Sequence, residues 1–189
     1  MDIMDIIKEK KQIRKLIKEL NLQYDRLYKD QASNIIFDKI ENLKEFQNAK
    51  NLLLYWSDNY EVNTHNFIVK WYKLKNIYLP TIISDTQMEF RLFEGIEKMK
   101  FSQKFKILEP IGQKIDKIEI INIAIIPGIA FDVYKNRMGR GKGFYDNFLK
   151  NKKFFKVGIC FDYQILNKIP VDTHDIKMDI IISEKREIV

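Results

Sequence analysis

The chain of 189 residues has few of the residues from which several common kinds of site are built. Its single cysteine, Cys160, allows neither an internal disulfide nor a CxxC zinc framework, which fits a reducing compartment. Its two histidines, His65 and His174, are far apart and lack metal-ligand spacing. No apolar run approaches the roughly 20 residues that span a bilayer, and the start MDIMDIIKEKKQ has no signal-peptide pattern. We therefore expect a cytoplasmic protein with no membrane partner.

Nucleophilic catalysis also has little support in the sequence. There is no GxSxG elbow to present a reactive serine. Cys160 lies in the middle of the apolar run KVGICF, where a buried, inert thiol is expected.

Positive charge is in excess, but arginine is scarce. The net charge is +7 and the isoelectric point is about 9.2, yet only six of the 33 basic residues are arginines. A basic chain can bind a polyanion such as nucleic acid. Here the lysines are spread along the whole sequence, so we interpret the excess as a compositional bias and expect no nucleic-acid partner. The few arginines are more informative.

Short apolar runs alternate with helical patterns along the chain. Ile13, Leu16, Ile17 and Leu20 share one face of a helix expected at about 5–20. Further helices are expected at 35–48, 64–73 and 144–150, and strands at 52–56, 77–80, 88–93, 121–127, 156–161 and 178–183. This alternation predicts an α/β fold in which residues 1–189 form a single three-layer domain, with a mostly parallel central sheet flanked by helices.

The few glycines gather in one region. Five of the seven lie at positions 128–158, and three alternate with cations in the sequence GRGKG. Glycines leave backbone N–H groups accessible to a bulky anion, and the helix expected after them adds its positive dipole end. The residues concerned are Gly139, Gly141 and Gly143, with the cations Arg137, Arg140 and Lys142. The segment therefore predicts a polyphosphate site.

This segment matches neither of the common phosphate-binding motifs. A P-loop needs Ser or Thr after Gly-Lys, but Lys142 is followed by Gly143. The dinucleotide motif GxGxxG fails because Phe144 stands at the third glycine. The simpler interpretation is a tight turn, but a turn needs only one or two glycines. Three glycines with interleaved cations favour phosphate binding.

Acidic residues near this segment leave two interpretations open. Asp146, in the first turn of the expected helix, either favours the helix dipole or binds Mg²⁺, which takes one or two carboxylates. The tail VDTHDIKMD supplies Asp172, Asp175 and Asp179, either as a solvated loop or as further metal ligands. Glu61 follows an apolar run and precedes a helical pattern, a position suited to a ligand-binding loop or to a simple first-turn acid.

Two cations near the N-terminus share one helix face. Lys10 and Arg14 are four residues apart and therefore adjacent on the helix surface. On spacing alone, a solvated basic face is the simpler interpretation.

The stretch IIPGIAFDVYKNRMGRGKGFYDNFL, 125–149, resembles the signature of the 5-formyltetrahydrofolate cyclo-ligases, also called methenyltetrahydrofolate synthetases. That family carries a PGxAFD segment, a short turn and then RxGRGxGYYD. Weaker similarity extends along nearly the whole chain. The pair Lys10 and Arg14, the segment YEVNTHNFI, the runs YLP, MEF and ILEP, and the tail PVDTHDIKMDIII fall in the family's order.

The resemblance implies an ATP- and Mg²⁺-dependent ligase. Its reaction converts 5-formyltetrahydrofolate and ATP into 5,10-methenyltetrahydrofolate, ADP and phosphate. Transfer of the γ-phosphoryl group to the formyl oxygen makes that oxygen a good leaving group, and the second folate nitrogen then closes the ring. Such an enzyme needs positioning and charge neutralisation more than a covalent nucleophile.

The resemblance also implies roles for individual residues. ATP is assigned to Lys10, Arg14, Arg137, Gly139, Arg140, Gly141, Lys142, Gly143, Phe144 and Tyr145, with Arg140 and Lys142 nearest the transferred group. Asp146 and Asp175 match the magnesium-binding acids. Glu61 matches the acid that binds the pterin ring, and Met88, Phe144 and Tyr145 border the folate. Phe144 departs from the family's usual tyrosine, which removes at most one hydrogen bond of about 0.5–1.5 kcal/mol.

Two other functions compete with this reading. A non-catalytic nucleotide- or RNA-binding module could use GRGKG as a phosphate clamp, but it gains nothing from acids beside that clamp. A phosphosugar-binding α/β domain has no need of Glu61 or of the pair Lys10 and Arg14. We expect the ligase, acting as a monomer.

Overall fold

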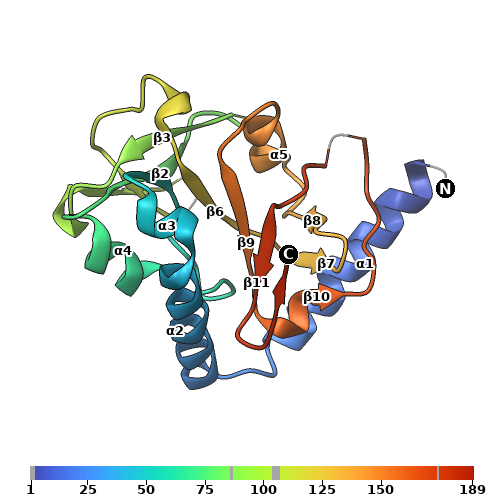
Figure 1. Ribbon diagram of the computed structural model, residues 1–189. Helices are drawn as coiled ribbons and strands as arrows, with labels where there is room; N and C mark the ends of the chain where they lie inside the picture. Colours follow the sequence, from blue (N-terminus) through green and yellow to red (C-terminus); the bar gives the residue numbers. More distant parts are fainter. Residues whose placement is uncertain (1–2, 86, 104–106, 174) are drawn as a thin grey trace.

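The computed structural model describes residues 3–85, 87–103, 107–173 and 175–189, so His174 lies outside the described residues. A seven-stranded sheet has the order β12-β11-β9-β6-β1-β2-β3 (Figure 1). Its five inner strands are parallel, and the edge strands β3 and β12 are antiparallel to their neighbours. The strands span Asn51–Leu53 (β1), Asn76–Ile82 (β2), Met88–Leu92 (β3), Ile123–Pro127 (β6), Phe155–Ile159 (β9), Ile180–Ile182 (β11) and Glu187–Ile188 (β12). The predicted mostly parallel sheet flanked by helices is confirmed.

The helices agree with the sequence patterns except in one segment. They span Ile3–Asn21 (α1), Arg26–Asn42 (α2), Lys44–Asn48 (α3), His65–Trp71 (α4) and Phe144–Leu149 (α5), with 3₁₀ turns at Ile96–Lys98, Ile118–Ile120 and Asp162–Gln164. The single helix expected at 35–48 is wrong. Asp25 starts α2 earlier, because its side chain accepts a hydrogen bond from the N–H of Tyr28 at 2.8 Å. Leu43 ends α2 because its backbone is extended, with φ −67° and ψ 132°.

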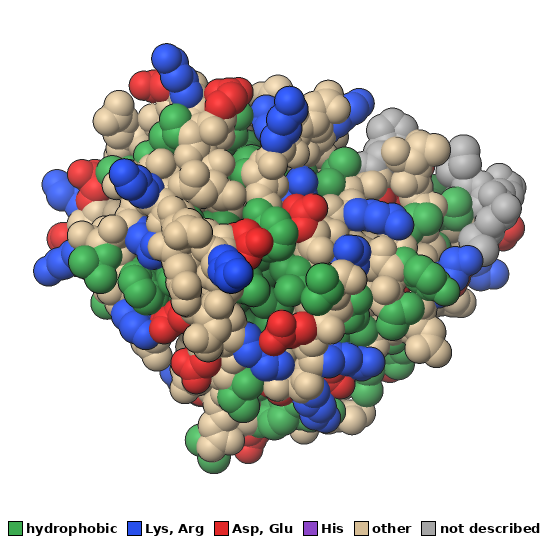
Figure 2. Space-filling model, in the orientation of Figure 1, with side chains coloured by type: hydrophobic (Ala, Val, Ile, Leu, Met, Phe, Trp, Pro, Cys, Tyr) green, Lys and Arg blue, Asp and Glu red, His purple; other side chains and the backbone are tan. Residues whose placement is uncertain are grey.

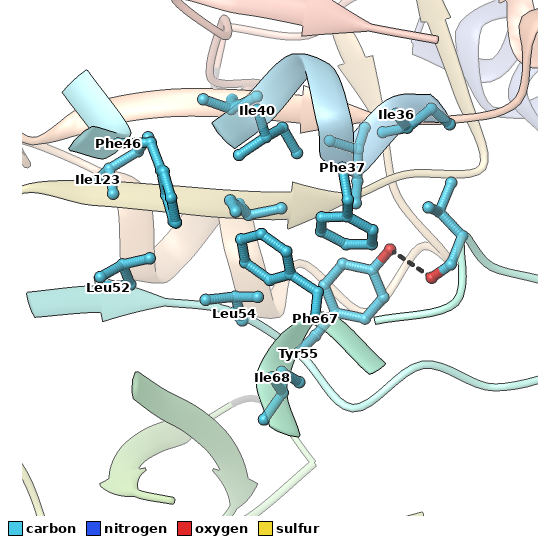
Figure 3. Close-up of a cluster of buried hydrophobic side chains, with 14 of the residues drawn as sticks. Ile36, Phe37, Ile40, Phe46, Leu52, Leu54, Tyr55, Phe67, Ile68 and Ile123 are labelled. Atoms are coloured by element: carbon cyan, nitrogen blue, oxygen red, sulfur yellow. Dashed lines mark hydrogen bonds between the residues drawn. The ribbon is translucent and has the colours of Figure 1, made fainter. Parts of the chain in front are cut away.

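One face of the sheet is covered by α2, α3 and α4 (Figures 1 and 3). Ile36 and Ile40 of α2 and Phe67 of α4 pack against strand residues such as Leu52 and Ile123, all of them buried. Figure 3 also shows the Tyr55 hydroxyl directed at the carbonyl of Val62, to which it donates a hydrogen bond of 3.2 Å. This contact ties the chain after β1 to the segment that leads into α4.

The opposite face of the sheet packs against α5. Along β6, Ile123 and Ile125 face the first core, whereas Ala124 and Ile126 face a second core that includes Leu149 of α5. Both faces of the central strands are therefore buried, which explains why these strands appear in the sequence as continuous apolar runs.

The N-terminal helix packs on a smaller sheet. Strands Ala130–Asp132 (β7), Arg137–Met138 (β8) and Ile165–Leu166 (β10) form this sheet, and α1 lies along it (Figure 1). Ile13 and Ile17 are buried against Ala130, Met138 and Ile169. Leu16, which the residue spacing places on the same helix face as Ile13 and Ile17, is not buried with them, since it is 45% exposed. A further antiparallel pair joins Met99–Ser102 (β4) and Ile107–Pro110 (β5).

The strand expected at 77–80 extends further than predicted. Strand β2 continues to Ile82, and β1 pairs with it only as far as Tyr78. Pro80 lies opposite Phe90 of the edge strand β3, so β2 continues alongside β3 after its pairing with β1 has ended.

Charged side chains of both signs are mixed on the face shown in Figure 2. Figure 2 shows Lys and Arg side chains scattered across the visible face, with Asp and Glu between them. None of the described helices combines the length and the apolarity that crossing a bilayer requires.

Candidate active site

The predicted site residues meet where the central strands end. Strand β6 ends at Pro127 and leads through β7 and β8 into the GRGKG segment, which precedes α5. Glu61 lies between β1 and α4. In open α/β sheets, ligands bind outside the carboxyl ends of the parallel strands. Residues 139–143, called the glycine loop below, therefore occupy the position that the topology favours.

Backbone conformation explains two of the glycines in the glycine loop. Gly141 has φ 97° and Gly143 has φ 70°, values in the left-handed region that other residues rarely adopt. Gly143 also caps the N-terminus of α5. A Cβ atom at Gly141 would lie 3.3 Å from the guanidinium of Arg14, so the small residue lets α1 approach the glycine loop closely.

The residue that fixes the approach to the glycine loop is Asp132, to which the sequence analysis gave no role. Its fully buried carboxylate accepts hydrogen bonds from the backbone N–H groups of Tyr134, Asn136 and Ile169 at 2.9, 3.0 and 3.1 Å. The Asn136 side-chain amide donates a fourth at 2.9 Å. This one side chain shapes the turn before Arg137 and ties it to the chain that leads to Asp175. Its presence in the AFD motif is the sequence signal that could have revealed it.

The pair Lys10 and Arg14 reaches the glycine loop from α1. Lys10 Nζ lies 2.6 Å from Asp175 Oδ2, and Arg14 Nε donates to the Gly139 carbonyl at 3.0 Å. Burial lowers the pKa of the Arg14 guanidinium, and the charge of Asp175 opposes that shift. These two cations belong to the site and not to a solvated helix face.

An open cavity of about 270 Å³ lies between α1 and the glycine loop, and we call it the cation-lined cavity. Cations and carboxylates face it together, as expected for an anion bound with a metal. Its lining residues are Ile7, Lys10, Arg14, Met138, Gly139, Gly141, Gly143, Asp146 and Asp175. Among the described residues, no three His, Cys, Asp or Glu side chains come close enough to hold a metal by themselves. A metal here would have two carboxylates and would need further oxygen ligands from phosphate and water, which is the usual arrangement for Mg²⁺.

Arg137 is a buried support of the site. Its side chain is 2% exposed and donates to Asp146 Oδ1 at 2.8 Å and to the Pro127 carbonyl at 3.1 Å. Its guanidinium lies 5.5 Å from the centre of the Tyr145 ring, and Nε is buried without a hydrogen-bond partner. These contacts orient Asp146 and fix the end of β6, and the role of Arg137 in ATP binding stays a prediction.

Glu61 lies on the other side of the glycine loop. Arg140 donates to its Oε1 at 2.9 Å, and the N–H of Asp58 donates to its Oε2 at 3.1 Å. Burial raises the pKa of Glu61, and the charge of Asp58 raises it further, whereas Arg140 lowers it. Burial likewise raises the pKa of the Tyr145 hydroxyl.

A small cavity of about 100 Å³ opens beside Glu61, and we call it the Glu61 cavity. It is lined by Glu61, Pro127, Gly128, Ile129, Arg137, Gly139, Arg140, Lys142, Gly143, Phe144, Tyr145 and Asp146. It shares the glycine loop with the cation-lined cavity, so ligands in the two would meet across that loop.

The structure thus brings together all but one of the predicted site residues. The exception is Met88, which begins β3 and packs against the second core with Phe90 and Leu149, away from the linings of these two cavities. Arg140, expected nearest to a transferred phosphoryl group, instead pairs with Glu61 and Asp58. No signal in the sequence pointed to Asp58.

Comparison with known proteins identifies the family. The model of the 5-formyltetrahydrofolate cyclo-ligase family matches residues 6–184. The chain belongs to this family. The match includes both Lys10 and Asp175, so the cyclo-ligase similarity extends over every segment of the site described above.

Individual cyclo-ligases support the assignment. The chain is 34% identical over 178 residues to a probable 5-formyltetrahydrofolate cyclo-ligase of Schizosaccharomyces pombe, covering 84% of this chain and 87% of that protein. It is 31% identical over 177 residues to the 5-formyltetrahydrofolate cyclo-ligase of Haemophilus influenzae, covering 90% and 95%.

Solved structures agree with the fold. The 5,10-methenyltetrahydrofolate synthetase of Aquifex aeolicus superposes with a TM-score of 0.84 at 27% identity, covering 94% of this chain and 91% of that one. The Mycoplasma pneumoniae synthetase gives a TM-score of 0.76 at 24% identity, covering 93% and 99%, and supports the fold alone.

Proposed function

We propose that this cyclo-ligase uses ATP and Mg²⁺ to convert 5-formyltetrahydrofolate into 5,10-methenyltetrahydrofolate, with release of ADP and phosphate. The observation that carries the proposal is the arrangement of the two cavities on either side of the glycine loop. One is lined by the cations and carboxylates that a metal-bound triphosphate needs, and the other presents the Glu61 carboxylate to a heterocycle that donates hydrogen bonds.

In this proposal the phosphates lie in the cation-lined cavity. Lys10, Arg14 and the backbone N–H groups of the glycine loop neutralise and orient them. Asp146 and Asp175 would hold Mg²⁺, which when bound neutralises charge on the phosphate oxygens. Both carboxylates are already ordered, since Arg137 holds Asp146 and Lys10 holds Asp175.

The folate would lie with its pterin ring at Glu61 and its formyl group toward the glycine loop. The formyl oxygen attacks the γ-phosphorus, a P–O bond forms, and ADP leaves. The second folate nitrogen then attacks the activated carbon and gives up its proton, and phosphate departs with the original formyl oxygen. The protein contributes alignment and positive charge, and no covalent intermediate with the chain is needed.

Lys142→Ala is expected to lower turnover far more than stability. Lys142 lines the Glu61 cavity, so its ammonium group can reach the transferred phosphoryl group. Because the side chain is exposed, its removal should change the free energy of unfolding little. We expect kcat to fall by about 100-fold or more, as for other losses of transition-state charge stabilisation. The melting temperature should change by less than about 2 °C, as for an exposed side chain. Parallel losses in kcat and melting temperature would refute this role.

Asp175→Asn is expected to raise the Mg²⁺ concentration needed for half-maximal activity by about tenfold, because the cation loses one of two carboxylate ligands. The KM for folate should remain unchanged. Asp38→Asn, which neutralises an exposed acid on α2, is the control and should leave the Mg²⁺ dependence as in the wild type. Identical Mg²⁺ curves for the two variants would exclude Asp175 as a ligand.

The test of the function itself is direct. Purified protein is mixed with 5-formyltetrahydrofolate and Mg·ATP, and the absorbance band of the methenyl product is followed. Absence of a signal from folded protein would favour the alternative, a non-catalytic nucleotide- or RNA-binding module. The mixed charges in Figure 2 favour the enzyme over an RNA-binding module. We further propose that the protein consists of one domain, is monomeric and cytoplasmic, and has no nucleic-acid partner.

A further inference from the structure

A cluster of three charged residues joins the glycine loop to the chain after β1. The guanidinium nitrogen Nη2 of Arg140 lies 2.5 Å from Asp58 Oδ2 and 2.9 Å from Glu61 Oε1. We call Asp58, Glu61 and Arg140 the clasp. Glu61 and Asp58 lie 79 and 82 positions before Arg140 in the sequence, so the clasp is a tertiary contact between two loops.

In the clasp, the Glu61 carboxylate that would bind the folate already accepts hydrogen bonds from the protein. Arg140 donates a hydrogen bond to Glu61 Oε1, and the backbone N–H of Asp58 donates one to Oε2. A carboxylate that pairs with a two-donor edge of the pterin must present both oxygens. A pterin edge that pairs with both oxygens of Glu61 therefore competes with Arg140 for Oε1.

Asp58 offers Arg140 a second carboxylate. Its Oδ1 accepts from the N–H of Tyr60 at 2.8 Å, which fixes the side chain while Oδ2 faces Arg140. When Glu61 turns to the folate, Arg140 can stay on Asp58 without moving into solvent or losing a counter-charge. The side chains of Arg140 and Asp58 are 55% and 34% exposed, so their pairing is screened by water and can shift easily.

We propose that Asp58 is a positioning residue, which receives Arg140 from Glu61 when the folate binds and so frees the Glu61 carboxylate for the folate. This inference rests on the proposed function, because it concerns the folate as substrate. It adds to that function a residue whose carboxylate influences the folate site through its contact with Arg140.

The simpler explanation of Asp58 is that it only shapes the turn at residues 58–61. Asp58→Asn separates the two roles, because the Asn side-chain oxygen can still accept from the Tyr60 N–H. Asp58→Ser is a second uncharged variant that keeps an oxygen for the same turn. If Asp58 only shapes the turn, both variants should behave as the wild type.

The experiment measures both variants with 5-formyltetrahydrofolate and Mg·ATP. We expect the KM for 5-formyltetrahydrofolate to rise about fivefold, as for loss of a partly exposed ion pair, with kcat within about twofold of the wild type. The Kd for ATP without folate and the melting temperature should not change. Asp38→Asn, which removes an exposed acid on α2, is the charge control and should leave all four values unchanged.

A second comparison tests whether Asp58 acts through Arg140. In an Arg140→Ala background, Asp58→Asn should change the KM for 5-formyltetrahydrofolate by less than about twofold, because no guanidinium remains to be received. A fivefold effect that persists in this background, or an unchanged KM in the single variants, would overturn the inference while the proposed function stands. If the wild type makes no methenyl product, the proposed function falls and the inference falls with it.

Discussion

Glu61→Gln is expected to weaken binding of 5-formyltetrahydrofolate by about 10- to 100-fold, because hydrogen bonds to an ionised acceptor contribute about 1.5–3 kcal/mol. A glutamine presents one acceptor oxygen and one donor amide, so it cannot pair with two donors of a pterin edge. The buried site of Glu61 makes the loss larger than it would be at the surface. Binding of ATP in the absence of folate should change by less than about twofold, because Glu61 lines the Glu61 cavity and not the cation-lined cavity.

Calorimetric titration of each ligand separately checks this prediction. Glu41→Gln is a matched control, since Glu41 also accepts from a cation, Lys70 at 2.7 Å, and from Trp71 Nε1 at 2.8 Å, on a different part of the surface. Its folate affinity should equal that of the wild type. If Glu61→Gln lost ATP binding and kept folate binding, our assignment of Glu61 to the folate half of the site would be wrong.

Arg137→Met is expected to lower the free energy of unfolding by about 3–5 kcal/mol, since it removes one partner of a buried ion pair. Asp146 would keep its charge, 18% exposed, with no guanidinium beside it, and the Pro127 carbonyl would lose its donor. The protein should also lose activity, because Asp146 would no longer be held in place.

Chemical denaturation of two companion variants decides whether burial is the cause. Arg186→Met breaks the pair between Arg186 and Asp162 at 2.7 Å, in which the arginine is 47% exposed, and should cost at most about 1 kcal/mol. Adding Asp146→Asn to Arg137→Met should recover part of the lost stability, since the uncompensated charge is removed. Equal losses in Arg137→Met and Arg186→Met would mean that Arg137 contributes no more than a surface pair.

The sequence was most informative where local patterns dominate. The burial of both faces of β6 follows from its continuous apolar run, and the helical stripe of α1 follows from residue spacing. The glycines of residues 139–143 revealed the loop that lines both cavities. Local patterns failed where tertiary packing decides. Leu16 fits the apolar stripe of α1, yet the small sheet covers only the side that carries Ile13 and Ile17.

It was harder to predict which side chains contact each other in the site than to predict which residues form it. Nothing near Arg140 in the sequence indicates that it pairs with two carboxylates about 80 positions earlier. Arg137 and Arg140 look alike in the motif, but one is buried against Asp146 and the other is half-exposed beside Glu61. The family resemblance selected residues that, apart from Met88, line the two cavities. Which cation faces which carboxylate depends on how loops from β1 and β6 meet at the edge of the sheet.

The contact between Lys10 and Asp175 also bears on how the enzyme is assembled. These two residues are separated by 165 positions, and the helix that carries Lys10 packs on strands from the second half of the chain. Long-range contacts of this kind form slowly, because the loop that they close must be ordered first. During synthesis the first helix therefore emerges from the ribosome long before its packing partners, and the proposed ATP site can form only after residue 175 has been made.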